Sequence, residues 1–436
     1  MLNMRNTKSL SKDRMSSFFN IKCNLGAVPF LVVLAIQGIP IGRELRVSKY
    51  LFTAERYQAV LEDISTTGIQ RTLITAIIWG IIYIIALFFI FNYAQSSFLR
   101  ALHRQWPITM LTILVPISML WTGNNQIVLM NSVHAIGALL VAFAASIVYW
   151  NKPDLLVRHI ALVLGINVAI HVVSIFLIPQ YTISYDGRWI GMTTNANTLG
   201  MLAALTIWAN MAAILISSDW RRSFSLILIG CSIFTLYGTN SITATICALI
   251  TVIFMIIVAR FRIIARHPLL ILIFVAPFIY IIGILFVDLF IQEFPQMFGR
   301  TSSLTGRVYI WNEALVLIQE KPLLGWGFDN NLSVIKESNL PTFHFHNGYL
   351  DITVRGGLVS LFLILTTFFF IIRYMTRHEC KMQIILFSYL AFFVVYNITE
   401  VSLFASRNVA WLIFLVLLFC AAPPKKTSRH IKIDTA

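Results

Sequence analysis

Continuous apolar runs of roughly 17–23 residues recur along the whole chain, and they limit its fold more than any other feature. A run of that length crosses the hydrocarbon core of a bilayer as an α-helix. A transmembrane barrel is excluded, because its strands alternate apolar and polar residues. The pattern predicts an all-α membrane protein with about twelve transmembrane helices. The predicted spans are 25–42, 72–92, 107–122, 126–149, 160–179, 197–217, 224–239, 242–259, 268–290, 348–372, 383–399 and 404–422.

The composition agrees with a membrane location. Hydrophobic residues make up 58% of the chain and charged residues 12%, about half the usual charged share of a soluble domain. Such a chain lacks the polar residues that a water-exposed surface needs. This excludes a soluble enzyme, a disordered chain and a nucleic-acid-binding domain. The net charge of +15 indicates basic loops that face the cytoplasm and anionic lipid.

The distribution of charge predicts the topology. If both termini are cytoplasmic, about two thirds of the 33 Lys and Arg residues fall on the inner side. The first outer loop, 43–71, fits least well, although its basic residues are offset by acidic ones. The predicted parts are a basic cytoplasmic N-terminus (1–24), spans one to nine (25–290), a large outer loop (291–347), spans ten to twelve (348–422) and a basic cytoplasmic tail (423–436).

The first apolar run and the positions of the cysteines argue against a cleaved signal peptide, a disulfide framework and a cysteine metal site. The first apolar run lacks a small-residue cleavage site, so we expect an uncleaved span rather than a signal peptide. The cysteines lie in predicted spans or at the inner face, which argues against a disulfide framework or a CxxC metal site. They are Cys23, Cys231, Cys247, Cys380 and Cys420.

The outer loop 291–347 stands apart by its length of about 57 residues. Its aromatic content argues against disorder. Within it, 307–320 is predicted to form an amphipathic helix that ends at Lys321-Pro322, with an apolar face of Val308, Trp311, Leu315 and Ile318. We expect a small folded cap on the membrane surface. Two smaller outer segments, 185–200 and 397–408, contribute Arg188, Glu400 and Arg407.

Several short motifs follow one another in order along these outer segments and the starts of the spans after them. They are Gly187-Arg188-Trp189, Ser303-Leu304-Thr305-Gly306-Arg307, Ile310-Trp311, Lys321-Pro322-Leu323-Leu324-Gly325-Trp326-Gly327, His346-Asn347-Gly348-Tyr349-Leu350-Asp351 and Gly356-Gly357-Leu358. Together they resemble the O-antigen ligase/polymerase superfamily, bacterial membrane glycosyltransferases of the GT-C type. The resemblance covers most of the chain from about residue 185 onward, and its order and spacing make it fairly specific.

The resemblance implies an enzyme of surface polysaccharide biosynthesis in the bacterial inner membrane, with its active site on the periplasmic side. Its donor would be an undecaprenyl-diphosphate-linked glycan, and its acceptor another glycan or lipid A–core. A chain-length regulator protein would be a partner, besides membrane lipids, and nucleic acid would not. The motif series is closer to exopolysaccharide polymerases than to ligases. The sequence departs from the family at two positions. Ile242 stands where ligases commonly carry an Arg, and Ser360 stands where the family's histidine-glycine pattern ends in Gly, Thr or Tyr.

The chemistry of the outer residues agrees with this resemblance. His346 is the candidate base for the acceptor hydroxyl, and Arg307 is the candidate clamp for the diphosphate leaving group. This pair predicts direct displacement with inversion. The outer loop lacks an acidic cluster for Mg²⁺ and the chain lacks a nucleotide-binding loop, so no metal and no cofactor are expected. The candidate substrate-binding residues are Arg188, Arg300, His344, Asn347, Glu400 and Arg407.

Each candidate also has a structural interpretation. Arg307 could be a solvated helix start, Arg188 an interfacial anchor beside Trp189, and His346 a residue that satisfies backbone groups at the start of span ten. For His344, a structural role beside His346 is favoured. Glu400 could orient an acceptor or pair with Arg407.

For four residues inside the spans the structural interpretation is favoured. Asp351 and Arg355 are spaced to form an ion pair within one helix, and His134 and His171 are expected to be hydrogen-bonded inside the bundle. A transporter or flippase is the alternative from another class. It fits less well, because the ionisable residues gather at one face and no internal repeat is visible.

Overall fold

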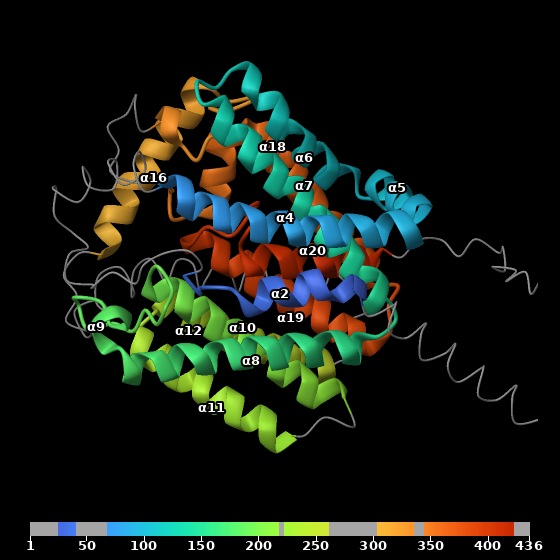
Figure 1. Cartoon of the computed structure of the whole chain (residues 1–436), viewed down its shortest axis with the longest axis vertical. Coiled ribbons are helices and arrows are strands. Elements are labelled where there is room, and N and C mark those ends of the chain that lie inside the picture. The colour runs from blue at the N-terminus through green and yellow to red at the C-terminus, as the bar shows by residue number, and fades with distance from the viewer. Residues whose placement is uncertain (1–24, 41–67, 218–221, 261–302, 335–343, 423–436) are drawn as a thin grey trace, which may run out of the picture.

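The computed structural model describes residues 25–40, 68–217, 222–260, 303–334 and 344–422. Most of these residues are helical, and their only strand-like pairing is an isolated bridge between Ile183 and Trp189. Figure 1 shows the helices running side by side as a bundle. The elements are η1 (Leu25–Ala27), α2 (Val28–Ala35), α4 (Gly68–Tyr93), α5 (Gln95–Arg104), α6 (Trp106–Ile117), η3 (Ser118–Leu120), α7 (Asn125–Tyr149), α8 (Pro153–Leu177), α9 (Pro179–Thr182), α10 (Ala196–Ile216), α11 (Arg222–Thr239), α12 (Ile242–Arg260), α16 (Ser303–Glu320), α18 (Gly348–Met375), α19 (Cys380–Thr399) and α20 (Val409–Ala421).

The prediction of an all-α, multi-span membrane protein is confirmed. Eight helices of the described part are long and apolar enough to cross a membrane, and three shorter apolar helices accompany them. Each coincides with a span predicted from the sequence. The predicted span 268–290, the residues Cys23 and Arg300, and parts of the loop 291–347 lie outside the described residues.

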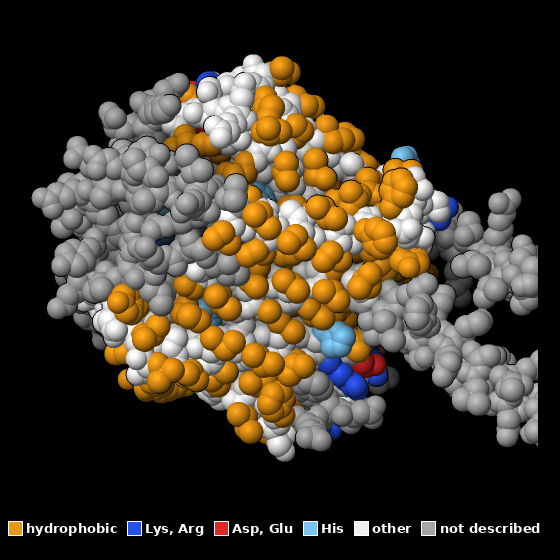
Figure 2. Space-filling view, viewed as in Figure 1, with side chains coloured by type: hydrophobic (Ala, Val, Ile, Leu, Met, Phe, Trp, Pro, Cys, Tyr) orange, Lys and Arg blue, Asp and Glu red, His pale blue; other side chains and the backbone are white. Residues whose placement is uncertain are grey.

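The bundle has an interior of mostly buried helices and a periphery that is apolar on its outside. Most of α10, α19 and α20 is buried, whereas α4 and α11 expose large apolar side chains such as Ile84, Phe91 and Ile227. Figure 2 shows apolar side chains spread over one flank of the molecule, with charged ones near its margin. An apolar surface this extensive is suited to lipid rather than water.

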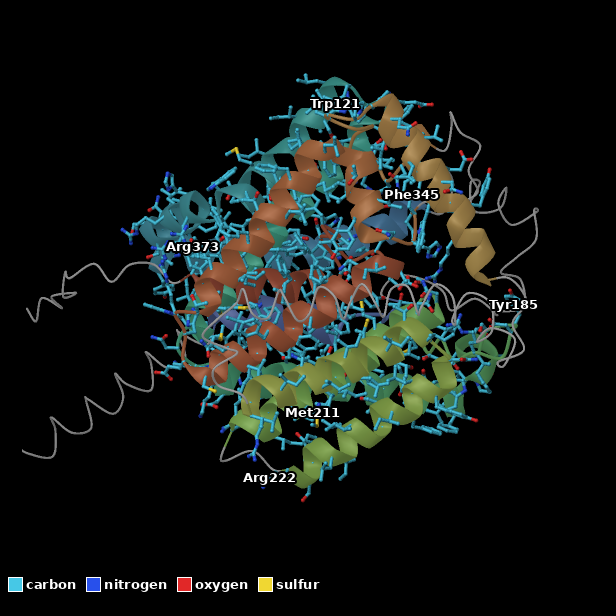
Figure 3. All side chains as sticks on the ribbon, turned by 180° about the vertical axis from the view of Figure 1, so that it is seen from behind. Trp121, Tyr185, Met211, Arg222, Phe345 and Arg373 are labelled. Carbon is cyan, nitrogen blue, oxygen red and sulfur yellow. The ribbon has the colours of Figure 1, made fainter. Side chains whose placement is uncertain are left out.

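The two ends of the bundle differ in charge. Figure 3 labels Phe345 at one end and Arg373 at the other, and we name the ends after these residues. The start of η1 and the end of α20 both lie at the Arg373 end, where Gly26 approaches Ala144 and His378 bonds to Ala421. This end also holds basic residues that the charge count places on one side. They are Arg100, Arg104, Lys152, Arg158, Arg222, Arg260, Arg373, Arg377 and Lys381. That this side is the cytoplasm stays a prediction.

Helix α18 is broken at Gly357, whose φ of 65° is not helical. The break frees backbone groups that must find partners inside the protein. The segment 322–327 supplies them: Trp326 N donates to Val354 O at 2.8 Å, and Leu358 N donates to Pro322 O at 2.7 Å. A Cβ at Gly357 would lie 2.0 Å from Leu323 O, so the approach requires glycine. The Pro-Leu-Leu-Gly-Trp-Gly and Gly-Gly-Leu motifs are therefore two halves of one backbone contact.

The described part of the outer loop folds against α18. Helix α16 contributes Ala314 and Leu317 to a small apolar cluster with Trp326, Phe345 and Val354. The predicted helix 307–320 is confirmed, although it begins earlier, at Ser303. Leu315 of its predicted apolar face is 49% exposed. The buried face is centred on Ala314 and Leu317, because packing against α18 rather than hydrophobicity alone sets the rotation of a short helix.

Candidate functional site

Glu400 is the centre of a polar cluster at the Phe345 end. It follows the last residue of α19 and is buried, with 7% of its surface exposed. Its Oε1 atom accepts from Arg307 Nη2 at 2.9 Å and from Asn197 Nδ2 at 2.7 Å. Arg307 also donates from Nη1 to Thr399 O at 2.8 Å. A carboxylate in this position holds the guanidinium of the cap helix against the end of α19.

Asn197 links this carboxylate to a second arginine. The Asn197 Oδ1 atom accepts from Arg188 Nη2 at 2.8 Å, and Arg188 Nε donates to Thr239 O at 2.8 Å. Asn195 caps the start of α10 through the amide of Thr198, so the loop before α10 is fixed from both sides. The chain of contacts runs Arg188–Asn197–Glu400–Arg307. We call these four residues and His346 the Glu400 cluster.

His346 lies near the other oxygen of the same carboxylate. Its Nδ1 atom lies 3.9 Å from Glu400 Oε2, which is longer than a hydrogen bond, and it makes no hydrogen bond within the described part of the chain. The residue has a φ of 49°, a left-handed conformation that turns its ring back toward the cluster. A carboxylate beside Nδ1 favours the tautomer with its proton there, which leaves Nε2 as the basic atom.

The electrostatics of the cluster favour an ionised Glu400. Burial raises the pKa of this carboxyl, but the interaction with His346 and the charge of Arg307 outweigh burial, so its pKa lies below the usual value. The neighbouring His344 ring lies 4.2 Å from that of His346, centroid to centroid. The pKa of His344 is lowered, first by burial and then by the charge of His346, and nearby Asp351 and Glu400 oppose this shift.

The turn between α11 and α12 contacts the cluster. Arg188 binds its Thr239 carbonyl, Ser241 Oγ lies 3.4 Å from Asn197 Oδ1, and Thr243 Oγ1 lies 2.9 Å from the Thr399 hydroxyl. Ile242 begins α12 at the point where the resemblance leads one to expect an arginine. Arg188 therefore brings a guanidinium to this turn from another segment.

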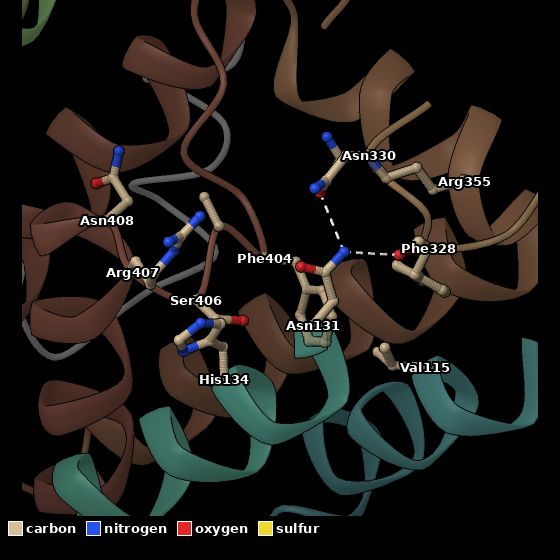
Figure 4. A pocket seen from close by; sticks show the side chains of 11 residues that line it. Val115, Asn131, His134, Phe328, Asn330, Arg355, Phe404, Ser406, Arg407 and Asn408 are labelled. Atoms are coloured by element: carbon tan, nitrogen blue, oxygen red, sulfur yellow. Dashed lines mark hydrogen bonds between the residues drawn. The ribbon is translucent and has the colours of Figure 1, made fainter. Parts of the chain in front are cut away.

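A separate cavity of about 260 Å³ opens at the same end (Figure 4). Two arginines line it, Arg355 from α18 and Arg407 from the turn before α20. The predicted ion pair is confirmed, with Arg355 Nη2 2.9 Å from Asp351 Oδ2. Glu400 bonds to Arg307, so the structure favours this pairing over the alternative with Arg407. The other lining residues are Val115, Asn131, His134, Phe328, Asn330, Phe404, Ala405, Ser406 and Asn408.

The predicted site residues thus divide into three groups. His346, Arg307, Arg188 and Glu400 meet in one cluster, with His344 beside it. Arg407 lines the cavity. Asn347 caps α18 instead, because its Oδ1 accepts from the amides of Tyr349 and Leu350 at 3.0 and 3.1 Å.

The two histidines expected to be structural are hydrogen-bonded in the bundle. His134 Nδ1 lies 2.8 Å from the Tyr83 hydroxyl. His171 Nδ1 accepts from Met192 N at 3.1 Å, and its Nε2 lies 3.3 Å from Gln37 O. Both predictions are confirmed.

Sequence reasoning did not select Asn197 and, of the described residues that line the cavity, proposed only Arg407 as a binding residue. Asn197 was visible as the second Asn of the Asn195-Ala196-Asn197 motif just before an apolar run, a position from which a polar side chain points toward the membrane surface. The cavity had no such signal, because Asn131, Asn330 and Arg355 lie in three distant segments.

The donor set offers little to a metal ion. Asp329 is buried and occupied by Asn124 Nδ2 at 2.9 Å and by Ser333. Within the described ranges no group of three or more His, Cys, Asp or Glu side chains is arranged to hold a metal. Metal independence stays a prediction.

Two comparisons with known proteins bear on this site. Residues 224–365 match the family model Wzy_C, described as O-antigen ligase. A stretch of 87 residues is 34% identical to the exopolysaccharide production protein ExoQ of Rhizobium meliloti (strain 1021), and covers 17% of this chain and 20% of that protein. The match thus spans about a fifth of that relative's length. The family match includes Arg307, His346 and Arg355, whereas Arg188 and Glu400 lie outside it. The chain is therefore similar to the O-antigen ligase family over residues 224–365 and has a multi-span helical fold.

Proposed function

We propose that the protein is a membrane glycosyltransferase that polymerises undecaprenyl-diphosphate-linked oligosaccharide repeat units at the periplasmic face of the bacterial inner membrane. The observation that carries this proposal is the Glu400 cluster, in which one buried carboxylate holds a guanidinium and an imidazole together. The family match supports the reaction class, and the similarity to an exopolysaccharide production protein favours a polymer product.

His346 acts as the base in this proposal. Its Nε2 atom accepts the proton of an acceptor hydroxyl as the oxygen attacks the anomeric carbon of the donor sugar. Glu400 stabilises the imidazolium that forms and fixes the ring orientation. The distance of 3.9 Å between Nδ1 and Oε2 allows this contact to shorten when substrate binds.

The arginines take the charge of the leaving group. As the new glycosidic bond forms, the bond between the anomeric carbon and the diphosphate oxygen breaks with inversion, and the diphosphate leaves as an anion. Arg307 uses two nitrogens on Thr399 and Glu400, so further N–H groups of its fork remain for phosphate oxygens. Arg188 is held by Thr239 and Asn197 and brings a second positive charge to the cluster. Arg300, His344, Asn347 and Arg407 complete the proposed substrate-binding set.

A ligase is the second candidate, since the matched family is described as O-antigen ligase. It would transfer a finished glycan from the same lipid carrier to lipid A–core or a protein. Both reactions need the same base and the same clamp, so the Glu400 cluster serves either. Ile242, in place of the arginine that ligases commonly carry, favours the polymerase.

Deletion of the gene, followed by gel analysis of surface polysaccharide, tests the proposal. Loss of long chains with single repeats still transferred would support a polymerase. Full-length chains retained on the carrier lipid would show a ligase instead, and unchanged polysaccharide would contradict both. Activity of the purified enzyme that survives EDTA would support the metal-independent mechanism, whereas a loss restored by Mg²⁺ would overturn it.

A further inference from the structure

We propose that the cavity lined by Arg355 and Arg407 is an acceptor subsite that binds a sugar carrying a carboxylate group. The inference rests on the proposed function, because an enzyme that joins two glycans must hold an acceptor beside the donor. At about 260 Å³ the cavity lies just below the roughly 300–1,000 Å³ of drug-sized sites, so it suits one small unit and not a lipid chain.

The charge of the lining calls for an anion. Among the residues that the structure describes, two arginines and no acidic residue line the cavity. Asp351 neutralises Arg355 from outside the lining, through Nη2, but Arg355 Nε is buried and makes no hydrogen bond within the described part of the chain. A buried donor left unpaired is costly, and a planar carboxylate is the partner that a guanidinium fork matches best.

The rest of the lining suits a sugar ring. Asn131 Nδ2 donates to Phe328 O at 2.7 Å and to Asn330 Oδ1 at 3.0 Å, as Figure 4 shows. These bonds leave the Asn330 amide nitrogen and the Asn131 carbonyl oxygen to bind hydroxyls. The Phe328 and Phe404 rings meet edge to face, with centroids 5.6 Å apart, and form an apolar wall. Amides on one side and aromatic rings on the other match the polar rim and the C–H face of a pyranose.

The backbone that presents Asn330 is strained and firmly held. Asn330 and Asn331 have φ values of 60° and 61°, two left-handed residues in succession. Such a turn persists only when its surroundings over-determine it. Phe328 N donates to Ser118 Oγ at 3.3 Å, and Asn331 Nδ2 donates to Asp351 Oδ1 at 3.2 Å. The turn therefore joins η3 to α18 and directs Asn330 into the cavity.

The cavity and the Glu400 cluster are neighbours. The charges of Asp351 and Arg355 act on His344, as do those of His346 and Glu400. His344 is therefore within electrostatic reach of residues of both sites. A sugar in the cavity would bring the next residue of its chain toward His346, as an acceptor must.

Binding to the purified protein in nanodiscs of neutral lipid tests the proposal by saturation-transfer NMR. The probes are D-glucuronate and D-glucose, which differ by the carboxylate. We expect glucuronate to bind about tenfold more tightly than glucose. Asn330→Asp places a negative charge in the cavity, retains the acceptor for Asn131 and tolerates the left-handed backbone, so it should abolish that preference. The matched control is Asn151→Asp, at an exposed left-handed residue between α7 and α8 at the Arg373 end, which should retain the preference.

A second variant, Arg407→Gln, should also reduce glucuronate binding several-fold, and Arg100→Gln at the Arg373 end should not. Equal binding of the two sugars, or a preference that survives both cavity variants, would overturn the proposal. A further outcome would also overturn it. If Arg407→Gln no longer bound vesicles containing undecaprenyl diphosphate while Arg307→Gln still did, the cavity would hold the donor diphosphate. His346→Ala should bind glucuronate normally. Unchanged polysaccharide after gene deletion would contradict the proposed function alone.

Discussion

The Glu400 cluster and the cavity lie at the same end of the bundle, and each contains two arginines. The positive charges of these arginines are neutralised differently at the two sites. In the cluster, Arg307 is bound by Glu400, and Asn197 connects the same carboxylate to Arg188. Within the described ranges, no acid lines the cavity and one buried guanidinium nitrogen of Arg355 makes no hydrogen bond. The comparison indicates that the cluster is preorganised for chemistry, whereas the cavity is poised for an anion supplied by a ligand.

The largest expected effect separates the two sites by activity. His346→Ala removes the proposed base and should lower the rate of glycan transfer by about 10²–10⁴-fold, with normal expression and membrane insertion. The measurement is polymer formation from lipid-linked repeat units in membranes. His103→Ala, at an exposed residue of α5 at the Arg373 end, is the matched control. Transfer at the normal rate in His346→Ala would remove His346 as the base.

Replacing Arg307 with lysine tests whether the cluster needs the guanidinium fork. A lysine ammonium cannot bind Thr399, Glu400 and a phosphate with the same fixed geometry, so transfer should fall by about 10²–10³-fold. The control is Lys321→Arg at the same end, where Lys321 stacks on the Trp326 ring at 3.5 Å. Full activity of Arg307→Lys would mean that Arg307 only secures α16.

Acidification should remove the stabilisation that the ionised Glu400 gives to the cluster. The folded-state pKa of Glu400 is lowered, so its contribution to stability is complete above the usual glutamate pKa and is lost as the pH falls through the lowered value. The thermal unfolding midpoint of the purified protein should therefore fall on acidification, and Glu400→Gln should remove that part of the decline. The exposed Glu320→Gln should leave it unchanged. Identical pH profiles for the original protein and Glu400→Gln would contradict an ionised Glu400.

The sequence predicts these two regions unequally. Span positions follow from apolar length alone, and Arg188, Arg307, His346 and Glu400 could be selected because charge is rare in this chain and these residues border predicted spans. Their meeting at one carboxylate could not be predicted, because it depends on how α10, α16 and α19 pack. The cavity is hidden for the same reason: Asn131 reads as an ordinary polar residue in a span, and Arg355 as half of an ion pair. Asn347 was selected from a motif as a substrate-binding residue, but its side chain caps the backbone amides at the start of α18.

The smallest effect tests whether the cavity depends on the break in α18. Gly357→Ala would place a Cβ against Leu323 O at a left-handed residue, and should destabilise the protein by about 1–3 kcal/mol. The shift should loosen Arg355, whose carbonyl accepts from Gly327 N at 2.7 Å, while the Glu400 cluster keeps its own bonds. We therefore expect glucuronate binding to fall more than the binding of undecaprenyl diphosphate vesicles. Gly80→Ala, where an added Cβ meets nothing within 4 Å, is the matched control for stability and binding. Equal losses at both sites would mean that the broken helix supports the whole Phe345 end, and that the cluster and the cavity form a single structural unit.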